Sequence, residues 1–288
     1  MILGIDIGNY SVKTSTGVNF KSLVSTEENL LGSKIKIEFD NKTFYIGEGN
    51  RDTELDKASK ESFLPLLYSA IALSSPAQYN KVVVGLPINQ YKSRKAEIEN
   101  KISKESNKKI ILNDKERTLT ITEFKVYPEG VGAYQSLDSE EDMIIIDIGG
   151  RTTDIAYIFN GELKTTSTVN VGTLNIYKNI ADQLNSKFSI DIDVEKAEKI
   201  IKQGYLSIDN KTVDISFVSS VLRENFMKIK ADLDFKFSAH TEKLMLTGGG
   251  AALFHKAFVN RYEDISIMQN PVLANVRGFK KVGELLWV

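Results

Sequence analysis

Two stretches built from aspartate, glycine and small polar residues have the chemistry to handle phosphate. They occupy residues 4–9 (GIDIGN) and 146–154 (IDIGGRTTD), and each closes an apolar run with high strand propensity. Where a strand ends in Asp-x-Gly, a carboxylate stands beside backbone N–H groups that no Cβ shields, so a phosphate oxygen can approach them closely. The carboxylate can hold a hydrated Mg²⁺ that bridges the phosphates. The repetition predicts two opposing jaws of one nucleotide site.

The residues at both hairpin tips are candidates for binding this nucleotide. Asp6 and Asp147 are the expected Mg²⁺ ligands, through water, although either one alone is more typical of a turn residue at a strand end. Lys13 lies on the strand after the first tip, where a salt bridge at the cleft edge and a phosphate contact fit the sequence equally well. The remaining tip residues that could surround the phosphates are Gly8, Asn9, Tyr10, Ser11, Gly149, Gly150, Arg151 and Thr152.

Glu129 and a glycine-rich turn are two further candidates. Glu129 follows Pro128 near a predicted helix start, so its carboxylate could position the water that attacks a γ-phosphate. The alternative is that Glu129 only complements the positive end of that helix. Residues 246–252 (LTGGGAA) turn from a strand into a helix, where a ligand can lie against bare backbone. The spacing of these glycines matches neither the P-loop nor the Rossmann fingerprint.

The elements that must position these residues recur in similar order. Strands are predicted at 2–7, 12–16, 20–25, 34–39, 43–46 and 82–87, and residues 45–49 (YIGEG) are expected to leave the sheet. Residues 91–109 are expected to form one exposed basic helix. The pattern restarts at Met143, with a hairpin at Asn160-Gly161 and helices at 173–186, 194–203, 215–234 and 251–259. This order predicts two related α/β lobes with a cleft between them.

Composition excludes several other kinds of function. The chain has 288 residues, 42% of them apolar and 26% charged, which suits a globular protein with two lobes. It has no cysteine and only two histidines, which argues against thiolate chemistry and histidine-based zinc sites. A net charge of −1 favours neither direct DNA binding nor an anionic membrane. Without a leader pattern or a long apolar run, a cytoplasmic location is expected.

The order of the motifs resembles that of the actin, heat-shock-chaperone and sugar-kinase ATPase superfamily. In that superfamily, residues 4–9 would correspond to the phosphate 1 motif, the stretch around Glu129 to connect 1 and residues 146–154 to phosphate 2. Residues 169–173 (VNVGT) would correspond to connect 2, and residues 246–252 to the adenosine motif. The chain looks most like bacterial actin-like plasmid-segregation proteins of the ParM/StbA type, given residues 45–49 and 270–278 (NPVLANVRG). The resemblance implies an α/β fold of two actin-like (ribonuclease-H-like) lobes, with domain I at 1–140 plus 272–288 and domain II at 141–271.

The resemblance also implies roles for particular residues. It makes Glu129 the water-positioning residue and places Asp6 and Asp147 on the water shell of Mg²⁺. Thr247, Gly248, Gly249 and Gly250 would lie against the adenosine, and Gly172 of the connect 2 stretch is a further nucleotide-binding candidate. Glu195 and Lys199 match loosely the family helix that borders the ribose and base, but an exposed i,i+4 pair fits at least as well. Arg151 departs from the family pattern, which usually has a small residue there, and the sequence leaves its contact with phosphate open.

The resemblance implies a Mg²⁺-dependent ATPase, with GTP as an alternative nucleotide, that polymerises into dynamic filaments for plasmid DNA segregation. Its partners would be further copies of itself, head to tail, and a DNA-binding adaptor, with no direct contact to nucleic acid or membrane. The alternative is a non-polymerising member of the superfamily such as a small-molecule kinase, for which Asp154 is a candidate base. A chaperone-like switch fits least, because no residues remain for a substrate-binding domain.

Overall fold

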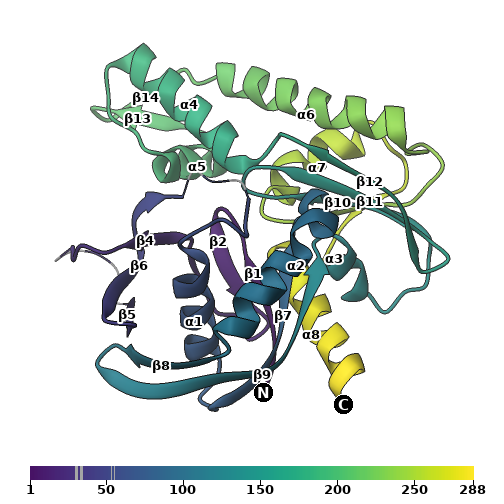
Figure 1. The fold of residues 1–288 in the computed structure, drawn as a ribbon. Helices are drawn as coiled ribbons and strands as arrows, with labels where there is room; N and C mark the ends of the chain where they lie inside the picture. Colours follow the sequence, from purple (N-terminus) through teal and green to yellow (C-terminus); the bar gives the residue numbers. More distant parts are fainter. Residues whose placement is uncertain (30–31, 33–34, 53, 55) are drawn as a thin grey trace.

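The computed structural model describes residues 1–29, 32, 35–52, 54 and 56–288. Within these residues the strands form two main sheets, one in each of two lobes, and Figure 1 shows the first lobe below the second. Both chain ends lie at the lower end of the first lobe. No helix in these ranges is both long and apolar enough to span a bilayer.

The first lobe is built on a nine-stranded sheet, counted over the described part of the chain, in the order β3-β2-β1-β7-β9-β8-β5-β6-β4. Strands β1 (Ile2–Ile7), β7 (Tyr79–Leu86) and β9 (Lys115–Pro128) run parallel at its centre. Beside β1 lie the antiparallel strands β2 (Ser11–Thr14) and β3 (Asn19–Lys21). The outer extension consists of β8 (Asn107–Leu112), β5 (Ile35–Phe39), β6 (Lys42–Arg51) and β4 (Leu23–Ser25).

The second lobe repeats the inner part of the first. Its sheet has the order β12-β11-β10-β15-β16, with bounds β10 (Met143–Ile148), β11 (Thr153–Phe159), β12 (Glu162–Val169), β15 (Leu244–Thr247) and β16 (Ile265–Ile267). Three antiparallel strands followed by two parallel ones also describe β3-β2-β1-β7-β9. The predicted class, two related α/β lobes, is confirmed. Each Asp-x-Gly tip therefore connects the first two strands of its lobe.

Helices pack against both sheets. Successive side chains of a strand point to opposite faces of its sheet, so apolar strand residues give each sheet an apolar surface that helices cover. In the first lobe, α1 (Phe63–Ser74) and α2 (Ile88–Lys104) share a core with the β1 residues Leu3, Ile5 and Ile7. In the second lobe, the core formed with β10 contains residues of α4 (Thr173–Phe188), α5 (Val194–Gln203), α6 (Phe217–Lys236) and α7 (Ala251–Val259). The isoleucine-rich run at the start of β10 is buried on both sides, as a central strand requires.

Two helices join the lobes at the base of the cleft. The short α3 (Val131–Gln135) packs against the second sheet through Val131 and Ala133. The last helix, α8 (Ala274–Trp287), follows the 3₁₀ turn Pro271–Leu273 and packs Val276 and Phe279 against Val83 of the first sheet. The chain end thus returns to the first lobe, as Figure 1 shows in yellow. The exact domain boundaries stay a prediction.

Several local predictions differ from the structure. The single strand expected at 20–25 is two strands, β3 and β4, which lie at opposite edges of the first sheet. The helix expected at 91–109 begins earlier, at Ile88, and ends at Lys104, because Asn107 already starts β8. Residues 45–49 stay in the sheet, since β6 continues to Arg51; Gly47 and Gly49 take positive φ there without ending the strand. A small hairpin, β13 (Leu206–Ile208) and β14 (Lys211–Val213), was not predicted. The first residue of the strand expected at 34–39 lies outside the described residues.

The contact between α3 and α8 leaves no space for a side chain at Gly278. A Cβ added there would lie 1.7 Å from the carbonyl oxygen of Gly132, which is fixed backbone. We expect Gly278→Ala to lower the free energy of unfolding by about 2–3 kcal/mol or more, since overpacking forces the two helices apart. Urea unfolding without nucleotide measures this. Gly249→Ala is the matched control, because its added Cβ meets no atom within 4 Å; equal losses in both variants would contradict the packing explanation.

Candidate functional site

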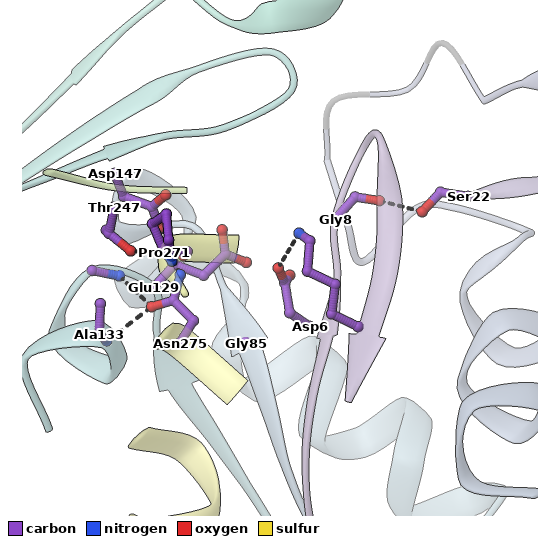
Figure 2. A network of polar contacts seen from close by, with 12 residues as sticks. Asp6, Gly8, Ser22, Gly85, Glu129, Ala133, Asp147, Thr247, Pro271 and Asn275 are labelled. Atoms are coloured by element: carbon purple, nitrogen blue, oxygen red, sulfur yellow. Dashed lines mark hydrogen bonds and ion pairs between the residues drawn. The ribbon is translucent and has the colours of Figure 1, made fainter. Parts of the chain in front are cut away.

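A polar cleft between the lobes brings both hairpin tips together. Its lining contains the predicted residues Asp6, Gly8, Asn9, Tyr10, Ser11, Lys13, Glu129, Asp147, Gly149, Gly150, Thr152, Gly248 and Gly249. The two tips approach each other closely: a Cβ added to Gly150 would lie 3.2 Å from the backbone nitrogen of Tyr10. In Figure 2, Asp6 on the first hairpin lies across a gap from Glu129 and Asp147. The duplicated tips therefore face one space.

Lysine side chains surround the carboxylate of the first tip. The Nζ of Lys13 lies 3.2 Å from Asp6 Oδ2, and the Nζ of Lys57 lies 3.5 Å from Asp6 Oδ1. Burial would raise the pKa of Asp6, but these two ammonium groups outweigh it and hold the pKa below its usual value. The tip itself is held by Ser22, whose hydroxyl donates to the Gly8 carbonyl at 2.5 Å (Figure 2). Asp6 is thus ionised and fixed in place.

The carboxylate of the second tip is held differently. Asn275, at the start of α8, donates its side-chain amide to Asp147 Oδ2 at 2.6 Å. Its amide oxygen accepts from the backbone N–H groups of Gly130 and Ala133, at 2.9 and 3.0 Å. Burial raises the pKa of Asp147, while the Asn275 hydrogen bond opposes that rise. Asn275 therefore ties Asp147, α3 and α8 into one unit, and the sequence analysis did not single it out.

Glu129 lies at the centre of the cleft against a buried lysine. The Nζ of Lys57 is 2.5 Å from Glu129 Oε1 and 3.3 Å from the Gly85 carbonyl oxygen, and Lys57 is only 1% exposed. Burial raises the pKa of Glu129 to about 8; the Lys57 ammonium opposes this, and the carboxylates of Asp6 and Asp154 add repulsion. A carboxyl group with a pKa near neutrality is suited to exchanging a proton with water.

Two functional candidates, Lys57 and Lys60, were missed because they lie in an irregular segment between β6 and α1. Lys60 is also buried and donates to Asn9 Oδ1 at 2.6 Å. Burial, helped by the neighbouring charge of Lys57, lowers the pKa of Lys60 to about 8. The only sequence signal is that two lysines stand three residues apart just before an apolar helix. That pattern is common on solvated surfaces, so it could not identify the site.

The cross-strand neighbours of the two aspartates differ between the lobes. Asp6 pairs in register with Lys13, whereas Asp147 pairs with Asp154. Asp154 is buried and accepts a 2.5 Å hydrogen bond from the Thr168 hydroxyl. Burial, together with the charge of Asp147, raises the pKa of Asp154 to about 7 against the effect of that hydrogen bond. The second hairpin, with two aspartates side by side, is therefore more acidic than the first, and this favours binding of a cation beside it.

The glycine-rich turn contributes to the cleft only in part. Gly248 and Gly249 line it, whereas Thr247 is buried and donates its hydroxyl to the Pro271 carbonyl at 2.9 Å. Gly250 lies behind the turn, with its N–H 2.9 Å from the Ile148 carbonyl. Gly172 packs against the backbone of Arg151, where a Cβ would come within 2.4 Å. These last three residues shape the site without lining it.

The α5 residues that line the cleft lie three positions, almost one helical turn, after the predicted ones. Glu198 and Lys202 line the cleft, while Lys199 is exposed and Glu195 lies outside the lining. Arg151 also lies outside the lining and donates to the carbonyl oxygen of Asp52 in the first lobe at 2.7 Å. An i,i+4 pattern gives the spacing of helical neighbours but not which face meets the cleft, so the sequence could not distinguish these pairs.

The residues present fit a hydrated Mg²⁺ bound together with phosphate. No group of three or more histidine, cysteine or acidic side chains within the described ranges is arranged as a metal site. Mg²⁺ in phosphate-transfer sites typically uses one or two carboxylates and takes its other ligands from water and phosphate. Asp6 and Asp147, buried on opposite jaws of one cleft, match that donor set.

Two duplicated α/β lobes around a polar cleft define an actin-type protein, and comparisons with known proteins agree. Residues 4–132 match the family of actin-like proteins, N-terminal domain, and residues 145–260 match the archaeal actin homologue MreB-like family, C-terminal. The two matches together cover most of the chain, which therefore belongs to the actin-like ATPase superfamily. By sequence alone, no curated protein gives a match.

Solved structures show the same fold over the whole chain. The archaeal actin homologue Ta0583 superposes with a TM-score of 0.84 at 17% identity, over 99% of both chains. The same protein in complex with ADP gives a TM-score of 0.80 at 17% identity, again over 99% of both chains. ParM from a 15-stranded filament of Clostridium botulinum gives 0.79 at 19% identity, with the same coverage of both chains.

Proposed function

We propose that this chain is a Mg²⁺-dependent ATPase that assembles head to tail into dynamic filaments, and that these filaments segregate plasmid DNA. The observation that carries the proposal is that Asp6, Glu129 and Asp147 line one interlobe cleft. Two buried carboxyl groups and a third that is only 14% exposed, at the meeting point of two glycine-rich tips, suit a metal-bound triphosphate better than an uncharged ligand. Ta0583, which has the same fold, was solved in complex with ADP, and this supports a nucleotide as the ligand.

Each residue of the cleft has a part in this proposal. Asp6 and Asp147 would hold a hydrated Mg²⁺, which would supply positive charge to neutralise the phosphates. The backbone N–H groups around Gly8 and Gly149 donate to phosphate oxygens. Glu129 orients the attacking water and receives its proton, because hydrolysis of a phosphoanhydride depends mainly on positioning and electrostatics. ATP is the proposed nucleotide, with GTP tested beside it.

Assembly through unlike surfaces explains how such an ATPase could act on DNA at a distance. A head-to-tail contact that does not close into a ring produces an open filament. ParM of Clostridium botulinum, which shares this fold, was solved as a filament. With a net charge of −1, the chain has no basic excess for binding DNA directly, so a DNA-binding adaptor would connect filament and plasmid in the cytoplasm.

The test is nucleotide-triggered assembly. We expect light scattering to rise when ATP and Mg²⁺ are added to the purified protein, and electron microscopy with a slowly hydrolysed ATP analogue to show filaments. Asp147→Asn, which removes one proposed Mg²⁺ carboxylate, should lose this response. ATP hydrolysis without polymer at any protein concentration would contradict the filament proposal. Hydrolysis that requires an added sugar or acid would instead support a small-molecule kinase.

A further inference from the structure

The first turn of α5 connects the second lobe to the first outside the cleft lining. Glu195 Oε2 lies 2.6 Å from the Nζ of Lys21 on β3, and Glu195 Oε1 lies 3.9 Å from Nη2 of Arg51 at the end of β6. Both basic residues belong to the first lobe. Glu195 therefore makes two ion pairs between the lobes.

Arg51 links this contact to the phosphate tip. Its Nη1 donates to the carbonyl oxygens of Tyr10 and Asn9, at 3.1 and 3.4 Å, and its guanidinium lies 4.8 Å from the centre of the Tyr10 ring. Asn9 and Tyr10 form the tip whose backbone faces the cleft. Any movement of Glu195 relative to Arg51 therefore acts on the position of the first tip.

A second interlobe contact lies three residues further along α5, on the same face. The Tyr10 hydroxyl donates to Glu198, and Glu198 in turn pairs with Lys202 at 2.7 Å. Burial and the charge of Glu198 raise the pKa of Tyr10, so its hydroxyl stays a donor at neutral pH. Together, Glu195 and Glu198 bring one face of α5 down onto the first tip.

The ion pairs of Glu195 can favour the closed arrangement of the two lobes, yet they are weak enough to break when the lobes open. The side chains of Lys21 and Glu195 are 47% and 40% exposed, so water and salt screen their attraction. Half-exposed pairs of this kind contribute little to the stability of a lobe. Between two lobes, however, the same attraction shifts the balance of open and closed states.

We propose that Glu195 is a positioning residue whose ion pairs with Lys21 and Arg51 hold the cleft closed over bound nucleotide. The inference rests on the proposed nucleotide site but adds a residue outside it. Closing the lobes by charge pairing slows the escape of nucleotide, while the tip residues perform the chemistry. Glu195 thus controls retention of the nucleotide rather than its hydrolysis.

The experiment measures dissociation of a fluorescent ATP analogue with Mg²⁺ by stopped flow, at low salt, in charge-reversed variants. We expect Glu195→Lys to raise the dissociation rate about five- to tenfold, since attraction becomes repulsion toward two cations. The double variant Lys21→Glu with Glu195→Lys restores the pair and should return within about threefold of the original rate. In Glu195→Lys, the hydrolysis rate at saturating nucleotide should change far less than the dissociation rate. If Glu195 were only needed for folding, both rates would change together.

A matched control and a salt series complete the test. Asp182→Lys disrupts the exposed pair with Lys178 inside α4 of the second lobe and should leave dissociation unchanged. Added salt should speed dissociation from the original protein more than from Glu195→Lys. An unchanged rate in Glu195→Lys, or no restoration in the double variant, would overturn the inference. If the original protein binds no nucleotide, the proposed function fails instead.

Discussion

Replacing Glu129 with glutamine is expected to lower the rate of ATP hydrolysis about 100- to 1000-fold, the usual contribution of a residue that accepts a proton and orients a nucleophile. Glutamine keeps the shape of the side chain but cannot accept the proton of the attacking water. Nucleotide binding should persist, because Asp6, Asp147 and both glycine tips are unchanged. The variant should therefore still polymerise with ATP and Mg²⁺, and its filaments should disassemble slowly.

Phosphate release and the decay of light scattering measure the two effects of Glu129→Gln together. Glu123→Gln provides the matched control, since Glu123 lies on the same strand, β9, with its side chain exposed. The control should hydrolyse ATP at the original rate. Normal turnover by Glu129→Gln would show that another group, with Asp154 as the next candidate, positions the water.

Removing the charge of Lys57 should have the largest effect on stability. Lys57→Met removes a buried ammonium group and leaves the carboxyl groups of Asp6 and Glu129 without the charge that pairs with both. Breaking a buried ion pair in this way costs about 3–5 kcal/mol, because the remaining charge is neither solvated nor compensated. Urea unfolding without nucleotide should show a loss of that size. The exposed Lys104→Met on α2 should show almost none.

The pH dependence of the Lys57→Met deficit identifies its electrostatic origin. Without the ammonium, the folded-state pKa of Glu129 rises further above its unfolded value, and Asp6 loses one of the two charges that hold its pKa below the usual value. Through Glu129, the folded variant therefore binds more protons than the unfolded chain. Stability then falls as pH increases above about 4, and the deficit should be larger at pH 8 than at pH 5. Adding Glu129→Gln should recover part of it. A deficit equal at both pH values, with no recovery, would indicate lost packing instead.

The buried lysines make the two sides of the cleft opposite in charge. Lys13, Lys57 and Lys60 all reach the first tip, whereas the second tip carries Asp147 opposite Asp154. A metal-bound triphosphate has both negative oxygens and a cation, so a cleft with one basic and one acidic side complements it in both parts. The Lys57 ammonium group pairs with both Asp6 and Glu129 on the basic side of the cleft.

Much of the fold could be predicted from local patterns. The β-branched run at 143–148, the Asn160-Gly161 turn and the spacing of apolar residues in 194–203 and 251–259 each specify an element without reference to distant residues. The predicted end of the helix at 91–109 was wrong, because helical charge spacing and strand pairing favour different structures at its last residues. Helical charge spacing continued to 109, but pairing with β9 recruited Asn107–Leu112 into β8.

The sequence by itself determined that two Asp-x-Gly tips exist, that each ends a strand of a repeated α/β unit, and which acidic and glycine residues they carry. Those features follow from strand propensity and from the lack of a glycine side chain, which are local properties. Only the tertiary structure decided that Lys57 and Asn275 reach the two aspartates, that Glu198 rather than Glu195 lines the cleft, and that Glu195 pairs across the lobes. Such contacts join residues far apart in the chain, so they depend on how lobes and helices pack and not on any nearby pattern.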